Sequence, residues 1–420
     1  LMAGFAVENH EIRLAETHFA RAAELAPDQP FHRLNREAFL LTYSQNPEVR
    51  AEAARDLESV LTNPEVNLIA VRALLFDAMR SGDLARAQQF AEKLGSLPGR
   101  TFSDDLSCLE AVMSQPAFHP ALEALEHRAE SDPLRTTETG DWLNAHGMSA
   151  EALRWFARLP EPIQSNVRVQ MTRAESYSAT YDWTELEAFL EKCHWDLGEY
   201  LRRAMLIRCK RELSQPWKKE WKQLVTEVDA TPTDGLLLAR LVTGWDWRPE
   251  TIELLWGAST KPQTESIALQ YLWDLYSRTN ETGELLRVAR AQLKLDPSNP
   301  VKKNNEAFLT LLLTGASDRA ERLASEAATL NPNVPEWAAT YAYALHLAGK
   351  KSEAKKVMDH LPAEALKRPG VALYYAIVLA ANGEDAKARE SLAKLNPNGM
   401  LPEEQKLAAD LATELKVKAP

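Results

Sequence analysis

Three side chains in this sequence have types and spacing that could bind a metal ion. His119, Glu123 and His127 recur at four-residue intervals, which would place two imidazoles and a carboxylate on one helix face. Pro120 follows the first histidine directly and favours a helix start at that point, because proline is well tolerated in the first turn. An acidic surface helix with incidental histidines therefore explains the pattern better than a metal site.

No compact catalytic or cofactor motif occurs elsewhere in the sequence. It contains no Walker-type phosphate loop, dinucleotide fingerprint, nucleophile elbow or zinc-protease helix. Carboxylate pairs such as Asp104-Asp105 lie near expected helix starts, where the helix dipole accounts for them without catalysis. We therefore expect no catalytic residue, no metal site and no cofactor, and we predict that the protein is not an enzyme.

The most strongly charged stretch spans residues 202–222, with eight Lys and Arg side chains against two Glu. It could bind an acidic peptide or lipid head groups, or nucleic acid phosphates with Trp217 and Trp221 stacking on bases. The alternative is that the cations cover a solvated helix face while the Trp rings pack between helices. The candidate residues for an anionic partner are Arg202, Arg203, Arg208, Lys210, Arg211 and Lys218.

The composition predicts that helices position all of these side chains. The chain of 420 residues contains 60 Leu against 7 Ile and 18 Val, and only 16 Gly. Leucine loses little side-chain freedom in a helix, whereas β-branched residues favour strands. The net charge of -11 argues against a general nucleic-acid-binding protein.

A 34-residue period organises the C-terminal third of the chain, in units 301–332, 335–362 and 369–397. In each unit a glycine can close the first helix in the left-handed conformation, and a small alanine lets the second helix approach closely. Proline then stops the second helix. This pattern resembles the tetratricopeptide repeat (TPR) family. The repeated residues are Gly315, Gly349 and Gly383 at the turn, and Ala320, Ala354 and Ala388 in the second helix.

The same period continues upstream with weaker marks, at intervals of 30 to 35 residues. The resemblance implies an all-α, right-handed α-solenoid of about 11 helix-turn-helix hairpins, with a C-terminal capping helix from Pro402 to Leu415. We expect an N-terminal TPR-like array (1–130), a degenerate middle array (131–262) and a C-terminal TPR array with the cap (263–420). Turns are expected near Pro47, Gly82, Pro116, Gly147, Tyr181, Gln215, Trp245 and Asn280.

The resemblance also implies where a ligand would bind, because the first helices of TPR hairpins line a concave groove that receives peptides. Lys302 and Asn305 would fit a clamp for a terminal carboxylate, but the following repeats do not continue it. An apolar and aromatic groove for an amphipathic helix is therefore expected, unless these residues pack against the capping helix. The peptide-binding candidates are Lys302, Asn305, Leu309, Tyr343, His346, Leu373 and Ile377.

The predicted function is a non-catalytic scaffold that binds a partner protein or peptide in the concave groove. The alternative is an accessory or regulatory subunit that contacts nucleic acid, another anionic polymer or lipid through residues 202–222, although the net charge disfavours nucleic acid as a partner. No apolar run reaches the roughly 18 residues of a membrane span, so a tether would need a segment before Leu1. Oligomeric state is not predicted.

Three scattered cysteines, Cys108, Cys193 and Cys209, are too few for a disulfide framework or a cysteine-based zinc site. Free thiols are favoured over a single bridge between Cys193 and Cys209. They slightly favour a cytoplasmic location, with a membrane-anchored or periplasmic location as the alternatives.

Overall fold

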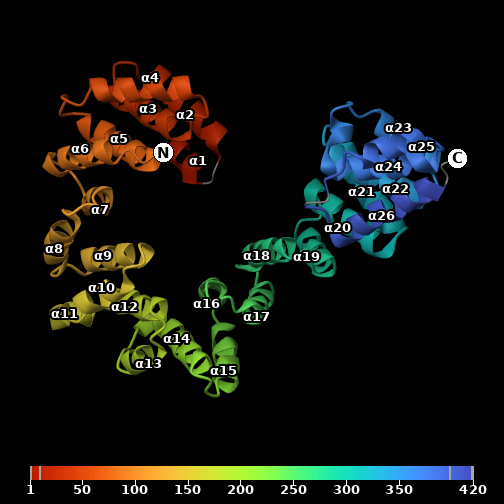
Figure 1. Ribbon diagram of the computed structural model, residues 1–420. Helices are drawn as coiled ribbons and strands as arrows, with labels where there is room; N and C mark the ends of the chain where they lie inside the picture. Colours follow the sequence, from red (N-terminus) through yellow and green to blue (C-terminus); the bar gives the residue numbers. More distant parts are fainter. Residues whose placement is uncertain (1, 9–10, 397–398, 418–420) are drawn as a thin grey trace. The chain divides into compact units, whose positions relative to one another are not determined.

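The computed structural model describes residues 2–8, 11–396 and 399–417, which form an all-α protein (Figure 1). Every regular element in these ranges is helical, and no strand occurs among them. The chain separates into two compact units, Leu1–Trp217 and Lys218–Pro420. The boundary between the units falls inside the middle array expected from the sequence. The division into three arrays itself stays a prediction, and so does a tether before Leu1, which lies outside the described residues.

The helices of the two units follow one another with short connections. The first unit contains α1 (Met2–Glu8), α2 (Ile12–Leu25), α3 (Pro30–Tyr43), α4 (Pro47–Ser59), α5 (Asn67–Ser81), α6 (Leu84–Ser96), α7 (Phe102–Ala111), α8 (Phe118–Ala129), α9 (Pro133–Ala145), α10 (Ser149–Phe156), α11 (Glu161–Gln164), α12 (Val167–Ala179), α13 (Trp183–Leu190) and α14 (Glu199–Glu212). The second unit contains α15 (Lys218–Val228), α16 (Pro232–Thr243), α17 (Arg248–Ala258), α18 (Glu265–Arg278), α19 (Thr282–Leu295), α20 (Pro300–Thr314), α21 (Asp318–Leu330), α22 (Pro335–Leu347), α23 (Lys351–Asp359), α24 (Pro369–Ala381), α25 (Asp385–Leu392) and α26 (Pro402–Val417).

Successive helices within each unit pack against each other, as Figure 1 shows for α5 and α6 or for α24 and α25. Ten helix-turn-helix pairs follow in order within the two units in the described ranges, from α3–α4 to α24–α25, while α14 ends the first unit and α15 begins the second. The all-α solenoid of hairpins predicted from the 34-residue period is therefore confirmed.

The backbone at the turns explains why the period is readable in some places and faint in others. Gly349 has a φ of +78°, a left-handed conformation that glycine adopts at little cost. Asn280 and Tyr181 occupy the same place with φ values of +54° and +59°. At two further turns the left-handed residue is Asp246 or Ser214, one position from the residue expected. The left-handed turn geometry is thus present even where the turn residue is not glycine.

Small residues allow the helices of a pair to approach closely. Ala320, Ala354 and Ala388 are all 1% exposed or less, which confirms the role expected of the second-helix alanine. Gly140 on α9 meets a similar demand, since a Cβ atom there would lie 2.5 Å from Cζ of Phe156. Contacts of this kind leave no room for a larger side chain without movement of the neighbouring helix.

The acidic pair at residues 104 and 105 proves to be structural. Thr101 and Asp104 form a capping box at the start of α7, with the Thr101 amide 2.6 Å from the Asp104 carboxylate. Arg72 on α5 donates two hydrogen bonds of 2.7 Å to the same carboxylate. Burial raises the pKa of Asp104, but the hydrogen bonds from Arg72 and Thr101 outweigh it and hold the pKa below its usual value. The carboxylate therefore joins two successive first helices.

Candidate peptide-binding sites

The apolar residues expected to line the C-terminal groove lie inside the second unit. Leu309, Tyr343, Leu373 and Ile377 are 2%, 4%, 0% and 8% exposed. Three of them belong to the same hydrophobic core as α26, and these side chains have almost no surface available to a ligand in this arrangement. Their predicted role in binding a peptide stays untested, while their packing agrees with the alternative that they contact the capping helix.

The remaining groove candidates are polar. Lys302 is half-buried, and its ammonium group lies 3.5 Å from the carboxylate of Asp296. Asn305 is half-buried on α20. His346 stacks on Tyr343 with ring centroids 6.3 Å apart, and burial lowers its pKa. The structure thus brings Tyr343 and His346 together on α22.

Three aromatic rings from three first helices form a continuous cluster beneath α26, and the stacked His346 ring extends it. Tyr374 on α24 lies between Phe308 on α20 and Tyr343 on α22, with centroid distances of 6.0 and 5.0 Å. Tyr374 is 1% exposed, and its hydroxyl donates a 2.7 Å hydrogen bond to Glu404 of α26. Burial raises the pKa of Tyr374 well above its usual value, and the Glu404 charge adds to this effect. The phenol therefore stays protonated and acts as a donor.

An open cavity of about 520 Å³ lies between α16, α17 and α18 of the second unit. Tyr271 in its wall is 44% exposed, and Ile267, one turn earlier on the same face of α18, is 50% exposed. An exposed apolar surface, formed by Ile267 and Tyr271, thus lies beside a cavity lined by charged residues. The lining residues are Ala239, Arg240, Thr243, Asp246, Arg248, Thr251, Leu255, Tyr271, Asp274, Leu275, Arg278 and Thr279.

The charges of this cavity differ in whether they are already neutralised. Arg248 pairs with Glu281 and also donates a hydrogen bond of 3.3 Å to Thr279. Arg240 and Arg278 are exposed, and neither forms an ion pair with any residue in the described ranges. Two cations at the wall of a cavity with an exposed aromatic ring suit a ligand that combines a carboxylate with an apolar side chain.

Sequence reasoning did not identify this cavity, because the repeat marks are degenerate from residue 200 to 260. One usable signal existed. Lys302 is predicted to face the groove from its position before the turn glycine Gly315. Ile267 lies the same number of residues before its own turn residue, Asn280. The same rule would have placed Ile267 on a ligand-facing surface.

The basic segment is divided between the two units and is largely engaged within the fold. Arg202 pairs with Glu199 and donates a 2.7 Å hydrogen bond to the carbonyl of Leu190. The guanidinium groups of Arg208 and Arg211 lie 4.8 and 5.1 Å from the ring centroids of Trp183 and Trp217, as in cation–π contacts. Arg203 and Lys210, which also lie on α14, are half-buried. Lys218, which is exposed, begins the second unit.

This arrangement agrees with the alternative that cations cover a helix while Trp rings pack. Trp221 is 3% exposed, and its ring contacts that of Trp247 edge to face at 5.9 Å. Burial lowers the pKa of Arg208. Binding of an anionic partner by this segment stays a prediction.

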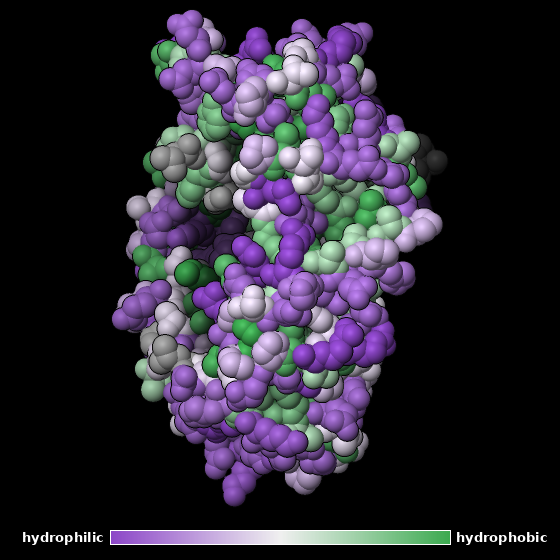
Figure 2. All heavy atoms as spheres, turned by 90° about the vertical axis from the view of Figure 1, so that its left-hand side faces the viewer, coloured by the Kyte–Doolittle hydropathy of each residue, from purple (hydrophilic) through white to green (hydrophobic). Residues whose placement is uncertain are grey.

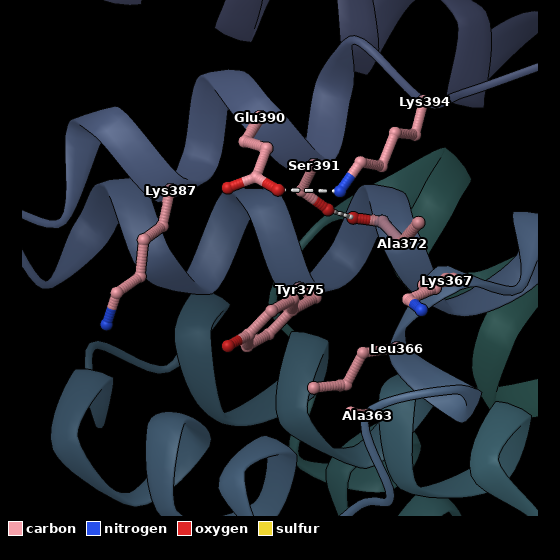
Figure 3. Close-up of a pocket in the computed structure, with 9 residues that line it drawn as sticks. All are labelled: Ala363, Leu366, Lys367, Ala372, Tyr375, Lys387, Glu390, Ser391 and Lys394. Atoms are coloured by element: carbon pink, nitrogen blue, oxygen red, sulfur yellow. Dashed lines mark hydrogen bonds and ion pairs between the residues drawn. The ribbon is translucent and has the colours of Figure 1, made fainter.

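A smaller pocket of about 190 Å³ lies over α24 and α25 and carries three lysines (Figure 3). Each ammonium group is already paired with a glutamate three or four residues away, and Ser391 donates to the Ala372 carbonyl over 3.0 Å. The positive charges of the three lysines are therefore already neutralised by ion pairs within the same segments. The pairs are Lys367–Glu364, Lys387–Glu384 and Lys394–Glu390.

The histidines considered as metal ligands are exposed and do not converge. Helix α8 begins at Phe118, two residues before the expected start at Pro120, so His119 lies in its first turn. His127 pairs instead with Glu130 at 2.9 Å. Among the residues that the structure describes, no group of three His, Cys, Asp or Glu side chains has the geometry to hold a metal ion.

All three cysteines are free thiols, as predicted, and the alternative bridge between Cys193 and Cys209 is not formed. Burial raises the pKa of Cys108 to about 11 and that of Cys209 to about 12. Thiols with such values are protonated at neutral pH and are poor nucleophiles.

The surface carries scattered apolar side chains. On the face drawn in Figure 2, hydrophilic residues predominate and hydrophobic ones occur in small groups. In the described ranges, no helix combines the length and apolar character that crossing a membrane requires.

Comparison with known proteins adds little to this geometry. No protein-family model matches the chain, and no curated protein matches it. Among solved structures, a chain in the structure of Naa15/Naa10 bound to HypK-THB is similar with a TM-score of 0.29 and 12% identity, over 97% of this chain and 69% of that one. A likeness of this degree supports no conclusion about function. On the geometry of its own hairpins, the chain is an all-α helical-repeat protein.

Proposed function

We propose that this protein is a non-catalytic helical-repeat scaffold that binds an extended segment of a partner protein in the cavity between α16, α17 and α18. The observation that carries the proposal is the pair of exposed guanidinium groups, Arg240 and Arg278, beside the exposed ring of Tyr271. The preferred ligand is a peptide that contains an Asp or Glu near an aromatic or leucine side chain.

The charge arrangement favours a peptide over a larger anionic polymer. Asp246 and Asp274 lie in the same wall as the arginines, so the site is mixed in charge rather than uniformly basic. The carboxylates would repel a polyanion, because it carries negative charge along its whole length. A short peptide can instead place a single carboxylate between the two arginines. The lining threonines are engaged within the fold, since Thr243 donates to the Ala239 carbonyl, Thr279 donates to Glu281, and Thr251 is 1% exposed. Recognition therefore depends on the arginines and Tyr271.

The predicted alternative, an anionic partner bound by the basic segment, is less well supported. Arg202 is engaged by Glu199, and Arg208 and Arg211 lie against Trp rings. Recruiting them would require those contacts to be exchanged for contacts with the partner.

The test is selection from a random-peptide phage library on the full chain. We expect enriched peptides to share an acidic residue close to an aromatic or leucine residue. In the variant Arg240→Ser/Arg278→Ser, a selected peptide should bind about tenfold more weakly, since two exposed charge pairs contribute roughly 0.5–1 kcal/mol each. Fluorescence anisotropy of the labelled peptide measures this change.

A matched control removes two exposed cations elsewhere in the same unit, on α19 and α23. Arg290→Ser/Lys356→Ser has the same change in net charge, and both residues are exposed. Its affinity should equal that of the wild-type protein. An equal loss of peptide affinity in both double variants would show a general charge effect. Unchanged affinity in both double variants would refute the proposed site.

A further inference from the structure

The C-terminal helix α26 extends beyond the place of an end cap. It packs on α24 and α25, the last hairpin, as a capping helix does, but it also contacts α20, two hairpins earlier (Figure 1). At its beginning, Glu403 accepts a 2.5 Å hydrogen bond from the hydroxyl of Thr282, the first residue of α19. The helix therefore contacts the first helices of two hairpins, α20 and α24, and the beginning of α19.

The contacts of α26 resemble those of a bound amphipathic helix. Two acidic residues in its first turn, Glu403 and Glu404, accept hydrogen bonds from buried hydroxyl groups of the repeats. Leucines then follow at four-residue intervals on one face: Leu407 is half-buried, and Leu411 and Leu415 are 8% and 1% exposed. All three pack into the core that contains the aromatic cluster.

A side chain of the last hairpin also contacts the far end of α26. Arg389 on α25 donates a 2.9 Å hydrogen bond to the carbonyl of Leu415, one of the carbonyls that a helix end leaves without a partner. On α22, His346 interacts electrostatically with Glu414 of α26, and its Nδ1 is buried and has no hydrogen-bond partner in the described ranges. The face under α26 thus keeps one polar atom that α26 does not satisfy.

Docking of α26 rests on few side chains. Three of its described side chains, Glu404, Leu411 and Leu415, are buried, whereas α24 buries eight of its 13 residues. Because α26 is the last helix of the chain that is described, its release would break no connection between the hairpins. Local opening of this kind requires less free energy than global unfolding.

We propose that α26 is a built-in ligand that occupies a helix-binding face of α20, α22 and α24, and that a partner helix with the same pattern replaces it. The pattern is two adjacent acidic residues followed by leucines at four-residue intervals. While α26 is docked, the face is closed, so the contact is autoinhibitory. This site is separate from the α16–α18 cavity and does not depend on it.

The test uses a fluorescent synthetic peptide of residues 402–417 and the full chain. In the variant Leu411→Asp/Leu415→Asp, the chain's own α26 can no longer dock, and the face becomes available. We expect the peptide to bind this variant at least about tenfold more tightly than the wild-type protein, because a tethered segment competes at an effective concentration in the millimolar range. Leu330→Asp, at a leucine that is 61% exposed, is the matched control and should bind like the wild type.

A second peptide tests the pattern itself. Replacing its two glutamates, Glu403 and Glu404, with lysine should abolish binding to the variant. Equal affinity of both peptides, or equal binding to wild type and variant while circular dichroism shows full helicity, would overturn the proposal.

Hydrogen exchange of the unmodified chain gives an independent result that needs no variant. Amides of α26 should exchange at least about tenfold faster than those of α24, since undocking precedes unfolding of the repeats. Equal exchange in the two helices would show that α26 is a permanent part of the core, and the proposal would fail. Loss of this site would leave the Arg240 and Arg278 result unaffected, so the two proposals fail separately.

Discussion

Glu126 on α8 offers a quantitative test of how the first unit is held together. Its side chain is buried, with the residue 8% exposed, and Oε1 has no hydrogen-bond partner in the described ranges. The nearest cation, Arg158, lies 3.8 Å from Oε2. Burial raises the pKa of Glu126 to about 7, Arg158 opposes this rise, and the charges of Glu151 and Glu123 add to it. At neutral pH the protein therefore bears the free-energy cost of a poorly compensated carboxylate.

The sign of the effect follows from this raised pKa. Below pH 4.5, near the value in the unfolded chain, the carboxyl is protonated in both states and costs nothing. As the pH rises from there to about 7, the unfolded chain releases its proton first, so the native state loses stability. Above about pH 7 the loss is constant.

The magnitude follows from the same shift. At about 1.36 kcal/mol per pKa unit, the rise from 4.5 to about 7 limits the penalty to about 3 kcal/mol. In Glu126→Gln the charge is gone, but the amide also needs hydrogen bonds, so we expect a net gain of about 2 kcal/mol at pH 8. The gain should vanish near pH 4.

Hydrogen exchange of peptides that cover α8 is a suitable assay, because the chain has two units and global unfolding need not be two-state. At a given pH the intrinsic exchange rate is nearly the same for both proteins, so the ratio of rates reports the difference in opening free energy. We expect α8 to exchange about thirty-fold more slowly in Glu126→Gln at pH 8, which corresponds to 2 kcal/mol. The same ratio at pH 4 and pH 8, or faster exchange in the variant at pH 8, would refute the reasoning.

Three further predictions concern other parts of the fold. Leu373→Asp would bury a carboxylate at a residue that is 0% exposed, so we expect a loss of at least about 4 kcal/mol and reduced helicity by circular dichroism. For His346, burial and the Lys351 charge lower the pKa below 6.5 while Glu414 opposes them, so native stability is lost as the pH falls below about 6.5; exchange of α26 should accelerate less in His346→Gln. Gly140→Ala would place a Cβ 2.5 Å from Phe156 and should cost about 1–3 kcal/mol, measured as faster exchange of α9.

The first of these predictions also affects how the groove should be studied. Substituting Tyr343 or Leu373 would remove core packing, since these residues are 4% and 0% exposed. Lost binding in such variants would therefore not distinguish a ligand contact from unfolding. Exposed residues such as Arg240 and Tyr271 avoid this ambiguity.

Local features of the chain were predictable from sequence because they depend on neighbouring residues. The spacing of Gly315, Gly349 and Gly383 marks turns at which φ is positive, and the alanines five residues later are buried as expected. Turn positions could be located within one residue even at Ser214 and Asp246, because the helical period persists on both sides of them. Backbone sterics and close helix packing act over one hairpin, which is the length that the pattern covers.

The ligand-binding surfaces depended on contacts that no local pattern contains. Thr282 and Glu403 are 121 residues apart in sequence, yet a hydrogen bond joins them, so α26 closes a face that the repeat alone would leave open. Whether Arg208 extends into solvent or lies against Trp183 likewise depends on the neighbouring hairpin. The helices, their turns and their order could be predicted from the sequence, because they follow from local sterics and periodicity. Which cations stay unpaired and which apolar faces stay open could not be predicted, because burial and pairing arise only when distant segments meet in the folded chain.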